Sequence, residues 1–80
     1  MVKDGIIKDT RVLDFSNNEM HPDMTTIEFE DGETITFMGR IEGIQIGRKY
    51  RIVYHEKNEY FRGESWSGKY NVIDSIEEVK

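Results

Sequence analysis

Two short runs of alternating residues, 25–29 and 33–37, flank the turn signal EDG at residues 30–32. Directly opposed residues of a β-hairpin share one face of the sheet, so the length of the turn decides which residues share a face. A two-residue turn at residues 31–32 would place the apolar side chains of the two runs on opposite faces. That register would divide the core.

A three-residue loop over residues 30–32, with Gly32 in the left-handed conformation, brings the apolar side chains onto one face. The pairs that this loop predicts are Phe29–Glu33, Ile27–Ile35 and Thr25–Phe37. We therefore predict this register, because a shift by one residue would turn every apolar side chain towards water. The polar face of the hairpin then carries Thr26, Glu28, Thr34 and Thr36.

Strand periodicity dominates the remaining sequence, and helical periodicity is nearly absent. The predicted strands are Ile6–Phe15, Thr25–Phe29, Glu33–Arg40, Lys49–Glu56 and Lys69–Val79. The alternation slips in the first and last strands, which indicates a bulge or coverage of both faces. Long, bent strands favour closure of the sheet, which also removes aggregation-prone edges. The sequence thus predicts an all-β fold, a five-stranded antiparallel small barrel with no substantial helix, as a single domain over residues 1–80.

The core is expected to form from the inward residues of the three middle strands. These residues are Ile27, Ile35, Phe37, Tyr50, Ile52 and Tyr54. The connection at residues 41–47, IEGIQIG, is too short for a full helix. We expect one helical turn there to plug the barrel with Ile44 and Ile46, before Gly47 turns the chain into the fourth strand.

This plan combines a long curved first strand, a three-strand meander, a short plugging connection and a closing hairpin, and it resembles the OB-fold. The connection leaves no room for the helix that is usual in that family, so an SH3-like barrel is the alternative. Residues 46–52, IGRKYRI, also look like the tyrosine-bearing strand of fibronectin type III domains, but 80 residues are too few for their ~7 strands. The OB-fold resemblance implies ligands across the second and third strands, between the loops Ser16–Asp23 and Lys57–Gly68.

The chain is acidic, with a net charge of −5, but its charges are unevenly distributed. Residues 40–70 contain seven Lys/Arg and four Asp/Glu, so a local cationic patch could meet phosphates or an acidic partner. The absence of cysteine removes disulfide and thiolate chemistry and fits a reducing compartment, so we expect a cytoplasmic location. No run of ~18 apolar residues occurs, and no membrane partner is expected.

The stretch EYFRGESWSGKY, residues 59–70, places four aromatic rings and an arginine among small residues. Planar faces beside a cation stack on unpaired bases or anchor protein interfaces. The same stretch could instead cover the core or extend the last hairpin. The candidate binding residues are Tyr60, Phe61, Arg62 and Trp66, with Lys57, Arg51 and Lys69 as further contacts.

Catalysis is not expected, because the chain contains no nucleophile elbow, phosphate-binding glycine loop or zinc-protease motif. His21 beside Glu19 and Asp23 lacks a second strong metal ligand, so we expect no metal and no other cofactor. The sequence predicts that the chain is a non-catalytic binding module or an accessory subunit, and that its partner is a protein. The alternative is single-stranded nucleic acid bound through residues 57–69. The neutral-to-acidic polar face of the second and third strands favours the protein.

Overall fold

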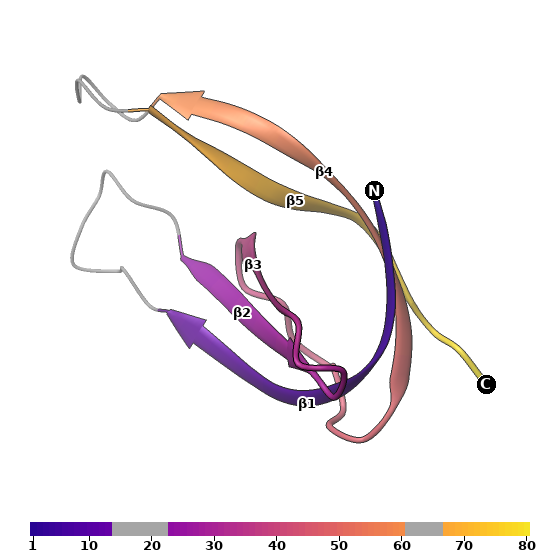
Figure 1. Cartoon of the computed structure of the whole chain (residues 1–80). Coiled ribbons are helices and arrows are strands. Elements are labelled where there is room, and N and C mark those ends of the chain that lie inside the picture. The colour runs from indigo at the N-terminus through magenta and orange to yellow at the C-terminus, as the bar shows by residue number, and fades with distance from the viewer. Residues whose placement is uncertain (14–22, 61–66) are drawn as a thin grey trace.

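The computed structural model describes residues 1–13, 23–60 and 67–80, and of residues 59, 60, 67 and 68 it describes the backbone alone. These residues form five strands and no helix (Figure 1). The strands are β1 (Val2–Leu13), β2 (Met24–Phe29), β3 (Thr34–Met38), β4 (Lys49–Tyr60) and β5 (Ser67–Glu78). In the order β1-β2-β3-β5-β4 they close into a barrel, which confirms the predicted all-β, five-stranded small barrel.

β1 belongs to both halves of the barrel. Its first half, Val2–Ile6, pairs with β4, and its second half, from Ile7 to Leu13, pairs with β2. The register with β2 shifts between Ile7 and Asp9, and such a bulge bends a strand and increases its twist. Figure 1 shows the resulting curve, in which one strand passes from one hairpin to the other. The bulge is one of the two alternatives that the sequence predicted, but the strand begins at Val2, earlier than the predicted Ile6.

The β2–β3 hairpin has the register that was predicted from parity. Ile27 lies opposite Ile35 and Thr25 opposite Phe37. Gly32 has a φ of 92° and its N–H donates to the Phe29 carbonyl at 3.0 Å, so the loop contains three residues with a left-handed glycine at its end. On the polar face, the hydroxyls of Thr26 and Thr36 hydrogen-bond to each other at 2.9 Å, which ties the two strands together outside the core.

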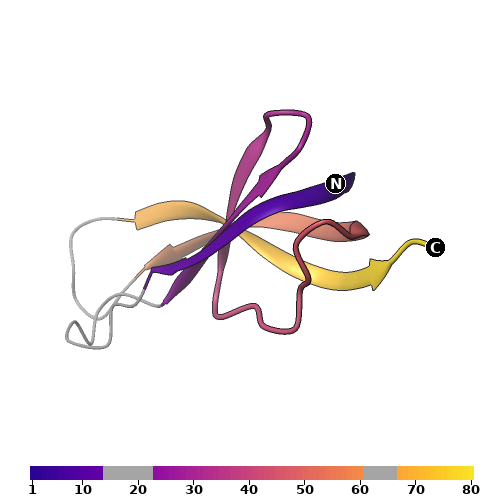
Figure 2. The same ribbon diagram turned by 90° about the horizontal axis from the view of Figure 1, so that it is seen from below.

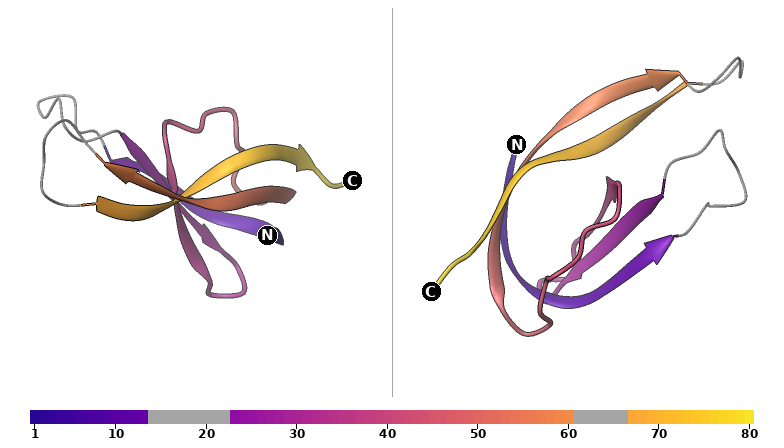
Figure 3. Two further views of the ribbon diagram at one scale, coloured as in Figure 1. Left: turned by 90° about the horizontal axis from the view of Figure 1, so that it is seen from above. Right: turned by 180° about the vertical axis from the view of Figure 1, so that it is seen from behind.

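β4 and β5 form a long antiparallel hairpin that extends to the pair Tyr60–Ser67. Residues 57–60 and 67–68 of the predicted loop Lys57–Gly68 are therefore hairpin stem, as one of the alternatives held, and residues 61–66 lie outside the described residues. β3 and β5 run parallel and pair only at Phe37–Asn71, so the expectation of an entirely antiparallel barrel was wrong at this junction. Figures 2 and 3 show the reason, since the β2–β3 hairpin crosses the β4–β5 hairpin steeply and the two diverge on either side.

The core lies between the two hairpins. Its buried residues are Ile7, Ile27, Phe29, Ile35, Phe37, Tyr50 and Ile52. Every predicted core residue is in this cluster except Tyr54, whose ring is half-buried and packs edge-on against Phe37 at 5.2 Å between centroids. Burial of one such side chain contributes about 1.5–3 kcal/mol, and these residues therefore stabilise a barrel that has no cross-link.

The connection between β3 and β4 was only partly anticipated. Ile41 and Ile44 pack against the core, but Ile46 is 63% exposed and the segment forms no helical turn. Its start is held by Thr25, which is fully buried. The Thr25 hydroxyl donates to the Gly39 carbonyl at 2.8 Å and accepts from the Ile41 N–H at 3.0 Å. Hydrogen bonds of the buried Thr25 hydroxyl thus hold the start of a connection that was predicted to be a helical turn.

Candidate binding site

One edge of β3 has backbone groups that no described strand pairs with. The Phe29 N–H donates to Glu33 at 2.9 Å and the Gly39 N–H donates to Asp23 at 2.7 Å, so odd-numbered residues of β3 point their backbone groups towards β2. Because these groups alternate along a strand, Thr34 and Thr36 point theirs away from β2. β5 meets this edge only beside Phe37, which leaves the N–H and C=O of Thr34 and the N–H of Thr36 open.

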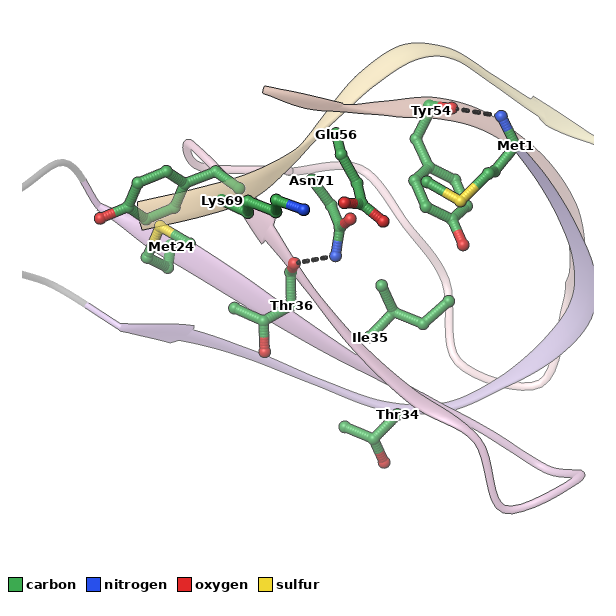
Figure 4. A pocket seen from close by; sticks show the side chains of 10 residues that line it. Met1, Met24, Thr34, Ile35, Thr36, Tyr54, Glu56, Lys69 and Asn71 are labelled. Atoms are coloured by element: carbon green, nitrogen blue, oxygen red, sulfur yellow. Dashed lines mark hydrogen bonds between the residues drawn. The ribbon is translucent and has the colours of Figure 1, made fainter. Parts of the chain in front are cut away.

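A hollow of about 540 Å³ lies at this open part of the β3–β5 junction, and we call it the seam. It is lined by Met1, Met24, Thr34, Ile35, Thr36, Tyr54, Glu56, Lys69, Tyr70 and Asn71. Figure 4 shows Ile35 directed from β3 into the hollow, with Tyr54 and Met1 across from it. The floor near Ile35 is therefore apolar, while the rim on β4 and β5 carries polar groups.

The polar rim of the seam consists of Glu56, Lys69 and Asn71, whose heads point into the hollow in Figure 4. Asn71 Nδ2 donates to the Thr36 carbonyl at 3.0 Å, which fastens β5 to β3 beside their single pair. Glu56 and Lys69 are exposed and form no ion pair within the part of the chain that the structure describes. The rim thus offers one carboxylate, one ammonium and an amide to an incoming group.

The predicted site residues fall into three groups. Phe61, Arg62 and Trp66 lie outside the described residues, and Tyr60 is described only as a backbone paired with Ser67. Lys57 and Lys69 lie on the facing strands of the same stem, where Lys57 opposes Tyr70 and Lys69 opposes Asn58. Both lysines are exposed. The two lysines thus lie close to the last pair of the stem, Tyr60–Ser67, but on opposite faces of the hairpin, because opposed residues share a face and successive residues alternate.

Arg51 lies apart from that group. It is six positions before Lys57 on β4, roughly 20 Å along a strand, and it belongs to the sheet that β4 forms with β1 and β5. Its guanidinium bonds Asp4 twice, at 2.9 and 3.3 Å. This contact lowers the pKa of Asp4 and raises that of Arg51. The side chain already has an anionic partner, in contrast to the free cation that a phosphate contact needs.

Ion pairs with carboxylates neutralise the positive charge of two further arginines in the basic stretch of residues 40–70. Arg40 bonds Asp23 at 2.8 Å and Arg48 bonds Glu78 at 3.2 Å, so acids from both ends of the sequence reach the arginines of residues 40–51. Folding therefore removes much of the cationic patch that composition suggested. Proximity in sequence gave no sign of this, because the partners are 17 or more positions apart.

A second hollow, of about 360 Å³, lies on the outer face of β1, β2 and β3. Its lining is Asp9, Arg11, Leu13, Thr26, Glu28 and Thr34. This is the face that the OB-fold resemblance implied for ligands, and it bears two carboxylates and one guanidinium. Lys8 lies 3.6 Å from Glu28 at its margin. The face is close to neutral and presents no aromatic ring from the lining residues.

Sequence reasoning missed the seam residues Thr34, Glu56 and Asn71. The available signal was the parity of β3, which already implied that Thr34 and Thr36 point their backbone groups away from β2. What the sequence did not show is which strand would lie on that side, and how little of the edge it would cover. That depends on the angle at which the two hairpins cross.

Other kinds of site find no support in residues 1–13, 23–60 and 67–80. No group of three or more potential metal ligands occurs there. Of the three residues that were considered as metal ligands, Asp23 bonds Arg40 instead, and His21 and Glu19 lie outside the described residues. No helix in this part of the chain is long and apolar enough to cross a membrane.

Comparisons with protein-family models, curated proteins and solved structures found no match for the chain.

Proposed function

We propose that the chain is an OB-fold-like, non-catalytic binding module that engages a protein partner through the seam. The partner would contribute an extended segment that lies along the open edge of β3 and continues its sheet. Such strand addition obtains affinity from main-chain hydrogen bonds and specificity from pockets for alternate side chains. The observation that carries this proposal is the open edge at Thr34 and Thr36 directly beside a hollow with an apolar floor.

A strand that stays open at its edge invites pairing, and folded proteins usually cover such an edge or blunt it. Here the open part is short, because the Thr36 carbonyl already accepts from Asn71 and only the Thr36 N–H and the backbone groups of Thr34 are open. A partner can therefore add only a few residues, which suits a weak or regulated interaction. The charges on the rim and the paired arginines also suit a peptide better than a polyanion.

Single-stranded nucleic acid is the second candidate, and one observation favours it. Lys57 and Lys69 stand at the base of the segment that contains Tyr60, Phe61, Arg62 and Trp66, and stacking rings beside cations are what single strands require. Trp66, the only tryptophan, provides the test. Nucleic-acid binding requires that an oligonucleotide quench its fluorescence, that salt weaken the effect, and that Arg62→Ala lower the salt dependence by about one phosphate contact.

The protein-partner proposal is tested through the backbone at Thr34. Proline at that position removes the N–H donor but is tolerated on an edge strand. Affinity-purified partner from native lysate, once identified and prepared pure, should bind the original chain and Thr34→Val alike and should lose binding to Thr34→Pro. Retention of full affinity by Thr34→Pro, with the barrel intact, would overturn strand addition at β3.

A further inference from the structure

We propose that the seam selects an extended peptide with an apolar residue and, two positions away, a lysine or arginine. This inference rests on the proposed strand addition and names the chemistry of the segment that is added. It follows from the side chains of Ile35, which lines the seam, and of Glu33, which lies just before β3 on the same face. Alternate residues of an added strand would share that face.

The apolar position comes from Ile35. In a strand that pairs with β3, the residue opposite Ile35 shares its face and enters the hollow. Ile35 is 8% exposed and lies there with Tyr54 and Met1 across from it (Figure 4). A valine or isoleucine at this position would bury apolar surface on both sides, while a charged residue would lose water without gaining a partner on the floor.

The basic position comes from Glu33, which lies two residues before Ile35 and therefore on the same face. Asp31 and Glu33 both bind the ammonium of Lys3, at 2.5 and 3.2 Å. The carboxylates remain 55% and 52% exposed, whereas the Lys3 side chain is 13% exposed. One ammonium thus pairs with two accessible carboxylates. The net negative charge of this group favours a cationic residue opposite Glu33.

The residue between these two positions would lie opposite Thr34 and point to the outer face. That face carries the hydroxyls of Thr26 and Thr36 and is open to water, so it sets no strong requirement. At the rim, Lys69 and Glu56 can meet a carbonyl oxygen and an N–H of the added backbone. The selected pattern is therefore an apolar residue, any residue, and a basic residue, read in the antiparallel direction, which is the more stable one.

Three capped peptides test the pattern: Ser-Val-Thr-Lys-Ser, its charge-reversed form Ser-Val-Thr-Glu-Ser, and the rearranged Ser-Thr-Val-Lys-Ser, in which the apolar and basic residues point to opposite faces. Binding is followed by the amide chemical shifts of Thr34, Ile35 and Thr36. We expect the first peptide to bind at least about fivefold more tightly than either of the others at low salt. Its advantage over the charge-reversed peptide should shrink as salt rises.

Glu33→Gln is the matched variant of the protein, because Asp31 still holds Lys3 after the change. It should reduce the preference for lysine over glutamate and leave the preference for valine in the correct position. Equal affinities of all three peptides, each lost in Thr34→Pro, would overturn this pattern and leave strand addition standing. Failure of every peptide to shift these amides at ~5 mM would overturn the pattern as well.

Two further results separate the pattern from the proposed function. Peptide binding that survives unchanged in Thr34→Pro would contradict strand addition itself. Displacement of the bound peptide by an oligothymidylate, with the same amides shifting, would assign the seam to nucleic acid and contradict both. The inference is supported if the three peptides rank as expected, if Thr34→Pro loses their binding and if the oligothymidylate does not displace them.

Discussion

The ring of Phe29 lies directly against the backbone of Gly5, so that a Cβ on Gly5 would come within 2.7 Å of Phe29 Cδ1. Gly5 is in the half of β1 that pairs with β4, whereas Phe29 ends β2. The contact therefore joins the two halves of the barrel at the bend of β1. Only a residue without a side chain lets the aromatic ring approach the strand so closely.

Gly5→Ala should destabilise the domain by about 1–3 kcal/mol, because overpacking of a filled core forces neighbours to move. Chemical denaturation measures the change in the free energy of unfolding. In a Phe29→Leu background the same substitution should cost less, since the smaller side chain leaves room for the methyl group. Equal costs in both backgrounds would show that the ring is not what excludes a side chain at Gly5.

Ile27→Ala should destabilise the domain by about 2–5 kcal/mol, since Ile27 is fully buried and the substitution leaves a cavity. Ile46→Ala is the matched control, because Ile46 is 63% exposed, and a surface change of this kind is usually within about 0.5 kcal/mol. Thermal and denaturant unfolding measure both. A large effect of Ile46→Ala would restore the barrel plug that the sequence suggested for this residue.

Thr25→Val should cost about 1–3 kcal/mol although it nearly preserves the volume of the side chain. The substitution removes the buried hydroxyl that accepts from the Ile41 N–H and donates to Gly39, and unpaired buried groups pay their desolvation in full. Thr34→Val is the control, because Thr34 is exposed. Unfolding of the two variants under identical conditions should separate them, and equal stabilities would contradict a structural role for the Thr25 hydroxyl.

Acid should weaken the barrel in a way that depends on two carboxylates. The ammonium of Lys3 lowers the pKa of Asp31, and the guanidinium of Arg51 lowers that of Asp4. A carboxyl whose pKa is lower in the folded state stabilises the fold above its ordinary pKa of about 3.8. That contribution is lost as the pH falls through the lowered pKa. The free energy of unfolding should therefore decline below about pH 4.

Asp4→Asn and Asp31→Asn should each make this acid decline shallower, because the amide does not titrate. Lys3 gives the opposite sign, since its bond to Asp31 raises its pKa. Its contribution is complete below its ordinary pKa of 10.5 and is lost as the pH rises through the raised value. Unfolding curves measured across pH for the three chains test this. Parallel acid profiles in all of them would show that these ion pairs do not couple folding to pH.

Asn71→Ala should loosen the junction of β3 and β5, because the side-chain amide reinforces their single pair. The loss of such a bond costs about 0.5–1.5 kcal/mol in global stability. The more specific effect is expected in hydrogen exchange, where the Met38 amide, next to the pair, should exchange faster. Asn58→Ala is the control, since Asn58 is exposed on the same hairpin. Unchanged exchange at Met38 would mean that the backbone pair alone closes the barrel.

Much of the fold could be predicted because parity leaves few choices in short strands. The hairpin register followed from placing Ile27, Ile35 and Phe37 on one face, and the inward face of β4 followed from the alternation of Tyr50 and Ile52. Both depend on neighbours within about a dozen residues. The extent of β4 and β5 was underestimated, since the polar run at residues 56–59 carries no apolar alternation and its pairing follows from the continuing ladder.

The parallel junction and the candidate site could not be predicted in this way. Whether β5 meets β3 over one pair or several depends on how far β1 bends at its bulge, and the residues of the bulge do not specify an angle. The ion pairs of Arg48 and Arg51 likewise join segments that are distant in sequence. The aromatic residues Phe61 and Trp66 stay a prediction, because they lie outside the described residues.

The junction of β3 and β5 has a consequence for how the molecule responds to an occupant. A closed barrel in which two neighbouring strands share only one residue pair opens between those strands at a smaller free energy than along its longer ladders. A segment lying across that point would bridge the two hairpins and act as a clasp. Occupancy should then raise the thermal midpoint with concentration, and it should slow exchange in both hairpins together.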